Sequence, residues 1–398
     1  MKFDIVFEGG GAKGMAFVGA YKALGERGHG YDRLLGTSAG AIAAVLLAAG
    51  YSVQEMQDAL AEQENNRSVF ASFLGAPQSF SDEDISRSAL RSLLREADIP
   101  FVPAGLEERI DDSLLRALLR TSQFRHLFSF VERGGWYVAD SFVAWMERKL
   151  DEGVYNGQAR RFSKLSFAQL HAETGVDLTL VAADTADARM LILNRRTAPD
   201  CPVVWGARMS MSIPLLWQEV VWQPQWGLYR GKDIAGNTVV DGGLLSGFPI
   251  ALFVSAQPEV TSVMGDKRSL DVLGLLIDER LALPVTRMSA PAAKTGLGLG
   301  SLRTAQRAGR LINTMTQAHD NAVIEAFAHL VVRLPARGYG TVEFDMSEAR
   351  RGALVDAAYE ATKQYLIRLE SEPVSFDPEE TARSARTADN MAARILDE

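Results

Sequence analysis

The chain has 398 residues, a formal net charge of −8 and a single cysteine, Cys201. The acidic balance argues against a nucleic-acid-binding protein, since phosphate backbones favour basic surfaces, and one cysteine excludes an intramolecular disulfide. The longest apolar run, 41–49, is shorter than the roughly 20 residues of a membrane-spanning helix, and no signal peptide is recognisable. We therefore expect a cytoplasmic protein whose contact with a membrane is peripheral.

A cluster of glycines follows the first apolar run. Residues 3–7 predict a strand and residues 15–24 predict a helix, so the glycines occupy a strand-to-helix turn. Residues 9–14 match G-x-G-x-x-G, a pattern that can hold a dinucleotide pyrophosphate at a helix N-terminus. The same turn could instead form an oxyanion hole from the Gly10 and Gly11 amides, or be a tight turn without function.

A second turn contains the motif G-x-S-x-G. Gly36 and Gly40 flank Ser38 between a short predicted strand and the apolar helix over 41–49. This pattern is typical of a nucleophile elbow, in which a neighbouring strand and helix leave no room for a Cβ at either glycine. The alternative is that Ser38 is an ordinary helix N-cap.

The rest of the chain predicts further strands and helices. Residues 53–150 have a helical, polar pattern and are interpreted as an insertion that could cover the site. A mobile loop is expected over 281–300, a helix over 301–329, and further helices after Ser347 and from Pro378. Strands are predicted over 178–183, 189–194, 237–243, 270–278 and 330–334. This order predicts an α/β protein with a parallel sheet.

A serine nucleophile needs a base, and Asp241 is the best candidate. It ends a predicted strand and precedes Gly242 and Gly243, so we expect its carboxylate at the carboxyl edge of the sheet, near Ser38. Burial among apolar neighbours would raise its pKa towards neutrality, as a general base requires. An Asx-turn role is the alternative. The histidines lack a supporting motif; they are His29, His126, His171, His319 and His329.

Tryptophan and cysteine supply weaker candidates. Trp205, Trp217, Trp222 and Trp226 lie shortly before the candidate base. We expect most of these rings to pack in the core, although an acyl channel or a membrane interface could also use them. Cys201 lies between two prolines without a neighbouring base, so a catalytic role is not expected.

Three motifs, in this order, resemble the patatin-like phospholipase family. They are Gly9-Gly10-Gly11-Ala12-Lys13-Gly14, Gly36-Thr37-Ser38-Ala39-Gly40 and Asp241-Gly242-Gly243. Residues 210–214, SMSIP, and 338–347, GYGTVEFDMS, also resemble stretches of bacterial members. The weaker likeness extends to about residue 370, so the resemblance covers most of the chain.

The resemblance implies a three-layer α/β/α fold, a modified α/β-hydrolase with a mainly parallel central sheet. On this basis we expect a catalytic domain over 1–370, followed by a charged tail or helix over 371–398. The helical insertion at about 53–150 is not itself predicted by the resemblance.

The resemblance also implies a lipid acyl hydrolase with a Ser-Asp dyad that needs neither metal nor cofactor. Ser38 would be the nucleophile and Asp241 the base, with the Gly10 and Gly11 amides as the oxyanion hole and Gly9 as a further contributor. Lys13 would brace the glycine loop rather than react. The other residues that would support the turns are Gly14, Gly36, Gly40, Gly242 and Gly243.

The implied substrate is a phospholipid or another acyl lipid, met through peripheral contact with a membrane. The sequence leaves open the head group, the acyl position and any protein or small-molecule activator. One alternative is a dinucleotide-binding protein that uses the glycine turn, but its candidate ribose-binding acid, Asp32, precedes a strand instead of ending one. The other alternative is a non-catalytic lipid-binding protein, which the presence of both Ser38 and Asp241 disfavours.

Overall fold

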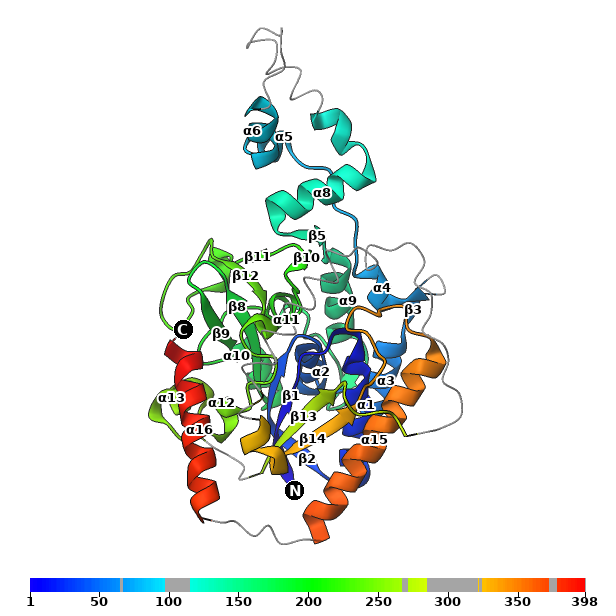
Figure 1. Cartoon of the computed structure of the whole chain (residues 1–398), viewed down its shortest axis with the longest axis vertical. Helices are drawn as coiled ribbons and strands as arrows, with labels where there is room; N and C mark the ends of the chain where they lie inside the picture. Colours follow the sequence, from blue (N-terminus) through cyan, green and yellow to red (C-terminus); the bar gives the residue numbers. More distant parts are fainter. Residues whose placement is uncertain are drawn as a thin grey trace.

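An eight-stranded mixed sheet lies at the centre of the molecule (Figure 1). The computed structural model describes residues 1–64, 67–96, 115–266, 271–284, 321, 324–371 and 378–397. The strand order is β11-β12-β8-β2-β1-β13-β14, and β9 pairs with β8 outside this path. The strands are β1 (Lys2–Phe7), β2 (Gly30–Thr37), β8 (Asp177–Asp184), β9 (Arg189–Leu193), β11 (Val220–Val221), β12 (Thr238–Asp241), β13 (Val272–Asp278) and β14 (Val331–Pro335).

The neighbouring strands β8, β2, β1, β13 and β14 pair in parallel, whereas β9, β11 and β12 pair antiparallel. Each strand expected from the sequence is present, with ends that differ by two residues or fewer. The prediction of an α/β protein with a mainly parallel sheet is therefore confirmed.

The register of the sheet brings the two predicted site residues to the same height. Thr37 of β2 pairs with Val181 of β8, and the next residue of β8, Ala182, pairs with Asp241. Because β12 is antiparallel to β8, our reason for placing Asp241 at the carboxyl edge is wrong: the carboxyl end of β12 points towards the opposite edge. The strand instead stops beside Thr37, and this early end places Asp241 next to the turn that holds Ser38.

Successive side chains of a strand point to opposite faces of the sheet, and this alternation divides the core into two clusters. Phe3, Ile5 and Phe7 of β1 pack in the larger cluster, whereas Val6 packs in the smaller one. The larger cluster includes residues of α1 (Ala16–Glu26), α2 (Ala39–Ala48), α11 (Val203–Ser210) and α15 (Glu348–Ser371). The smaller cluster includes residues of α12 (Ala251–Val254), α13 (Pro258–Met264) and α16 (Pro378–Asp397). Helices therefore cover both faces, which gives three layers.

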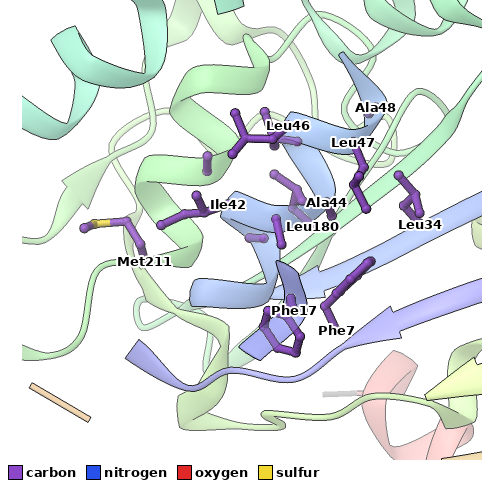
Figure 2. Packing of buried hydrophobic residues seen from close by; sticks show 14 of the residues in the cluster. Phe7, Phe17, Leu34, Ile42, Ala44, Leu46, Leu47, Ala48, Leu180 and Met211 are labelled. Atoms are coloured by element: carbon purple, nitrogen blue, oxygen red, sulfur yellow. The ribbon is translucent and has the colours of Figure 1, made fainter. Parts of the chain in front are cut away.

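Helix α2 begins directly after Ser38 and is buried along its whole length. Figure 2 shows Ile42, Ala44 and Leu46 of α2 in the same packed cluster as Phe17 and Leu180. A helix that is apolar on every side is stable only in the interior, and its small alanines allow close contact with the sheet. The packing of α2 therefore fixes the turn from which it starts.

Residues 53–151 are mainly helical in their described part and divide between two clusters. Met56, Phe73 and Trp145 belong to the larger core, whereas Ile85 and Phe128 belong to a separate small cluster. In Figure 1, α5 and α6 lie far from the sheet. The elements are α3 (Val53–Ala61), β3 (Gln63–Glu64), β4 (Arg67–Ser68), α4 (Val69–Ser72), α5 (Asp82–Ser86), α6 (Ala89–Glu96), α8 (Ser122–Arg133), β5 (Gly135–Tyr137) and α9 (Asp140–Asp151).

The remaining elements are short: β6 (Val154–Tyr155), β7 (Gln158–Ala159), α10 (Phe167–Thr174), β10 (Leu215–Trp217), and the 3₁₀ turns η1 (Gly11–Met15), η2 (Pro224–Trp226), η3 (Gly242–Leu244) and η5 (Ala328–Leu330). The loop expected over 281–300 and the helix expected over 301–329 fall mostly outside the described residues. Within the described ranges, no helix is both long and apolar enough to cross a membrane. The domain boundary near residue 370 stays a prediction.

Candidate active site

The glycine turn lies directly against the serine turn. A Cβ at Gly9 would lie 3.3 Å from the Ser38 Cβ, and a Cβ at Gly14 would lie 2.9 Å from the Ala39 Cβ. Gly11 has a φ of +54°, and a Cβ there would lie 2.2 Å from the Thr341 carbonyl oxygen. The glycines are therefore needed for close approach of main chains on two sides.

The amides of this turn differ in whether they have a hydrogen-bond acceptor. The Gly9 amide donates to the Gly247 carbonyl at 2.9 Å, so it is already engaged and does not fit the contribution to an oxyanion hole that we expected. The amides of Gly10 and Gly11 have no hydrogen-bond acceptor in the described part of the chain. Unpartnered amides at the start of a helical turn attract negative charge.

Lys13 is buried and connects this turn to its surroundings. Its Nζ forms an ion pair with Glu279, just after β13, and donates to the Thr341 Oγ1 at 3.1 Å. The Ala12 amide donates to the Thr341 carbonyl at 2.9 Å. These contacts fit the bracing position that we expected for Lys13.

Ser38 has an unusual backbone conformation. Its φ is 54° and its ψ is −120°, a region that residues other than glycine rarely occupy, and its side chain does not cap α2. Its amide donates to the Ser210 Oγ at 3.0 Å. A Cβ at Gly36 would lie 2.4 Å from the Gly40 carbonyl oxygen. The N-cap alternative is thus not what the geometry supports, and the close packing expected of a nucleophile elbow is present.

Asp241 is 4% exposed and meets Ser38 through their side chains. Its Oδ1 accepts the Gly243 amide at 2.8 Å. The Ser38 side chain lies beside the carboxyl and favours its charged form. Burial raises the pKa of Asp241 to about 7, although the Gly243 amide and the Ser38 side chain oppose the rise. A carboxylate with this pKa can accept a proton near neutral pH.

The main chain of Asp241 is held by the segment 210–214. The Asp241 amide donates to the Ser212 carbonyl at 2.9 Å. The Ser212 hydroxyl contacts the buried guanidinium of Arg208, which also donates to the Gln218 carbonyl at 2.8 Å. Burial lowers the pKa of Arg208 to about 10, with the opposing charge of Asp140 nearby. The SMSIP stretch noted in the sequence therefore positions both turns, since Ser210 holds the Ser38 amide.

An apolar pocket of about 50 Å³ opens at Ser38. Its walls come from the two turns and α2 on one side. Residues in or next to α4 and β10, the segment that precedes α15 and the first turn of α15 form the rest. The lining residues are Gly11, Ala12, Gly14, Met15, Ser38, Ala39, Ile42, Ala43, Leu60, Ser68, Phe70, Phe73, Met211, Ile213, Trp217, Glu343, Phe344, Met346 and Arg351. The volume is small against the roughly 300 to 1,000 Å³ of sites that enclose drug-sized ligands, so a long chain can enter only if side chains move.

Several residues considered from the sequence lie away from this pocket. No histidine within the described residues lines it, and His319 is outside them. Cys201 is fully buried elsewhere, and burial raises the pKa of its thiol. Trp222 and Trp226 pack on each other in the core, as expected, whereas the buried Trp217 also lines the pocket.

The sequence did not identify the pocket wall opposite the two turns. Phe73 and Trp217 are joined by a hydrogen bond from the Trp217 Nε1 to the Phe73 carbonyl, 2.8 Å long. Phe344 packs edge-on against Trp217 at 5.7 Å between ring centroids. Two signals for this wall were present in the sequence: the stretch 338–347, which contributes Glu343, Phe344 and Met346, and Trp217, which we considered for an acyl channel. In the described ranges, no group of three or more His, Cys, Asp or Glu side chains could hold a metal ion.

Known proteins that are similar to this chain include a curated sequence and solved structures. The uncharacterized protein YqhO of Bacillus subtilis (strain 168) is 25% identical over 374 residues, covering 92% of this chain and 98% of YqhO. Among solved structures, VipD from Legionella pneumophila has a TM-score of 0.44 at 15% identity, covering 98% of this chain and 75% of VipD. The type III effector protein ExoU has a TM-score of 0.40 at 17% identity, covering 99% of this chain and 61% of ExoU. The model of the patatin-like phospholipases matches residues 5–254, and the chain therefore belongs to that family.

Proposed function

We propose that this protein is a lipid acyl hydrolase that cleaves carboxylic esters of membrane lipids through a Ser38–Asp241 dyad. The observation that carries this proposal is the position of the Ser38 side chain beside a buried carboxylate whose pKa is raised to about 7. Family membership and the apolar pocket at Ser38 support an acyl lipid as the substrate.

The mechanism follows from the positions of these groups. Asp241 takes the proton of Ser38 as the serine oxygen attacks the ester carbonyl, and the Gly10 and Gly11 amides stabilise the resulting oxyanion. The protonated Asp241 then gives its proton to the departing alcohol, which leaves an acyl group on Ser38. Water, deprotonated by Asp241, attacks this ester, and Asp241 returns the proton to the departing serine oxygen as the fatty acid is released. No step requires a metal or a cofactor.

Peripheral contact with a membrane is part of the proposal. Leu127 and Val131 of α8 and Leu215 of β10 are 38%, 42% and 40% exposed. β10 pairs with β5, which directly follows α8. β10 also contains Trp217, which lines the pocket. Exposed apolar residues on elements connected to the pocket wall would let this face of the molecule contact a bilayer.

The dinucleotide alternative is not favoured by the position of Asp32. This residue lies near the start of β2 and pairs with Lys2 at 3.1 Å, whereas the glycine turn follows the end of β1. Because β1 and β2 run in parallel, roughly five residues of strand, or about 16 Å, separate Asp32 from the height of the turn. A ribose held at the turn would be out of its reach.

The decisive experiment compares wild-type protein with Ser38→Ala on vesicles of a mixed lipid extract, with mass spectrometry of the products. We expect the variant to lose fatty-acid release by roughly 10⁴-fold or more. Ser52→Ala is the matched control, because Ser52 is an exposed N-cap of α3 with its own capping box and its loss should leave release unchanged. Equal release by wild type and Ser38→Ala would remove the proposal, and lipid binding without any release would favour the carrier alternative.

A further inference from the structure

Arg351 is a buried cation in the wall of the pocket that contains Ser38. It lies in the first turn of α15 and is 7% exposed. A guanidinium has five N–H donors, yet the acceptor it finds in the described chain is the Met346 carbonyl, 3.1 Å from Nη1. No carboxylate of the described residues lies within ion-pair distance of it.

The other buried cations of the described chain are better compensated. Arg33 pairs with Asp4, Arg160 with Glu55, and Lys13 and Lys149 also pair with glutamates. Arg208 lacks a direct ion pair but donates to a serine hydroxyl and a main-chain carbonyl. A buried charge without such partners is costly, so Arg351 is an exception that needs an explanation.

Arg351 lines the pocket and keeps donors without an acceptor in the described chain. Four side-chain polar atoms of the described chain are buried without a partner, on Asp4, Thr37, Arg125 and Arg195, and none belongs to Arg351. Its Nε and Nη2 have no described acceptor, and the residue lines the pocket.

The acid that shares this wall does not neutralise Arg351. Glu343 also lines the pocket, but its carboxylate accepts Arg350 Nε at 2.8 Å, Arg350 Nη2 at 3.2 Å and the Gly340 amide at 3.1 Å. The charges of Glu343 and Arg350 therefore neutralise each other, and the wall keeps one positive charge, that of Arg351, among apolar side chains. An anion placed there would form charge-assisted, partly desolvated hydrogen bonds, which the planar guanidinium can make in pairs.

We propose that Arg351 binds the phosphate of the substrate, so that the site prefers acyl esters whose alcohol half is anionic over neutral glycerides of the same chain. This inference rests on the proposed hydrolase function. α15 packs against η1, which places the anion site on the side of the pocket formed by the oxyanion turn. The acyl chain would then occupy the apolar side formed by Ile42, Phe73 and Trp217.

The kinetic test uses two substrates with the same oleoyl chain, 1-oleoyl-lysophosphatidic acid and mono-oleoylglycerol. Arg351→Gln should lower the ratio of kcat/KM for the anionic over the neutral substrate by roughly ten- to hundred-fold, mainly through KM. Arg351→Lys keeps the charge without the planar fork and should give a smaller loss. Arg368→Gln, an exposed position on the same helix, should leave the ratio unchanged. An unaltered ratio in Arg351→Gln, including an equal loss on both substrates, would overturn the proposal.

A binding measurement separates this proposal from the proposed function. In the Ser38→Ala background, calorimetry should detect dodecyl phosphate binding, and adding Arg351→Gln should weaken it roughly ten-fold or more. This holds even if wild-type protein hydrolyses neither lipid, in which case the hydrolase proposal fails alone. Dodecanoate that binds as tightly as dodecyl phosphate, with the same dependence on Arg351, would assign the guanidinium to the product carboxylate and contradict a phosphate site.

Discussion

The pocket has two walls that are fixed in different ways. The motif wall, formed by Gly11, Gly14, Ser38 and Ala39, is held by main-chain contacts. The side-chain wall, formed by Phe70, Phe73, Trp217, Phe344 and Met346, is held by interlocking rings, with centroids 5.2 Å apart for Phe70 and Phe73. In our proposal, one wall carries the chemistry and the other surrounds the acyl chain.

The two walls differ in which amino-acid substitutions they can accept. Around the motif wall, a Cβ at Gly11, Gly36, Gly40 or Gly242 would come within 2.2 to 2.5 Å of a main-chain carbonyl oxygen. Main chain cannot be replaced, so these positions admit only glycine. Apolar side chains can be exchanged when their total volume is kept, so the side-chain wall needs no fixed residues. Substitutions in the motif wall should therefore abolish function, whereas those in the side-chain wall should adjust it.

The largest effect is expected for Asp241→Asn. An amide cannot take the serine proton, so kcat should fall by roughly 10³- to 10⁴-fold, while the Gly243 amide still finds an acceptor. Steady-state kinetics on a soluble acyl ester measures this change, and circular dichroism confirms the fold. A loss below ten-fold in the folded variant would show that the base lies elsewhere.

The stability of the same variant relative to wild type should increase as the pH rises. The pKa of the Asp241 carboxyl is 3.8 in a model compound and about 7 in the folded protein. Its stabilising contribution is therefore complete below about pH 4 and is lost as the pH rises through 7, because the buried group must ionise. Asparagine never ionises, so the unfolding free energy of Asp241→Asn relative to wild type should increase between pH 4 and pH 8, by on the order of a few kcal/mol. Urea denaturation at both pH values checks this, and a difference independent of pH would contradict the raised pKa.

A smaller loss is expected when a Cβ is added to the glycine turn. Gly11→Ala combines an unfavourable positive φ with a collision at the Thr341 carbonyl, so its amide should move and kcat should fall by roughly 10²- to 10³-fold. Gly157→Ala is the control: Gly157 has a φ of +81° and open space around its Cβ position. That control should cost about 1 kcal/mol of stability and leave kcat unchanged. Equal kinetic effects of the two substitutions would mean that the oxyanion turn is not where we place it.

These differences explain which features the sequence could predict. The strands, the three turns and the approach of Ser38 to Asp241 were predictable because packing at the glycines leaves no freedom of residue type. The antiparallel direction of β12 was not, because a four-residue strand followed by glycines reads the same in either direction. Arg351 was missed because its neighbours, Arg350 and Glu348, make it look like part of a solvated helix face, and only the fold reveals that it is buried.

The smallest effect is expected in the side-chain wall itself. Phe344→Leu removes the ring that packs on Trp217 and widens the pocket beyond its present volume of about 50 Å³. The ratio of kcat/KM for long over short acyl chains should change by only a few-fold, because a methylene-sized difference in an apolar pocket discriminates weakly. Phe248→Leu is the control, since Phe248 is buried in the core cluster on the other face of the sheet. Both variants should lose similar stability, so a change in chain-length preference confined to Phe344→Leu locates the acyl chain against this wall, and an unchanged preference would place the chain elsewhere.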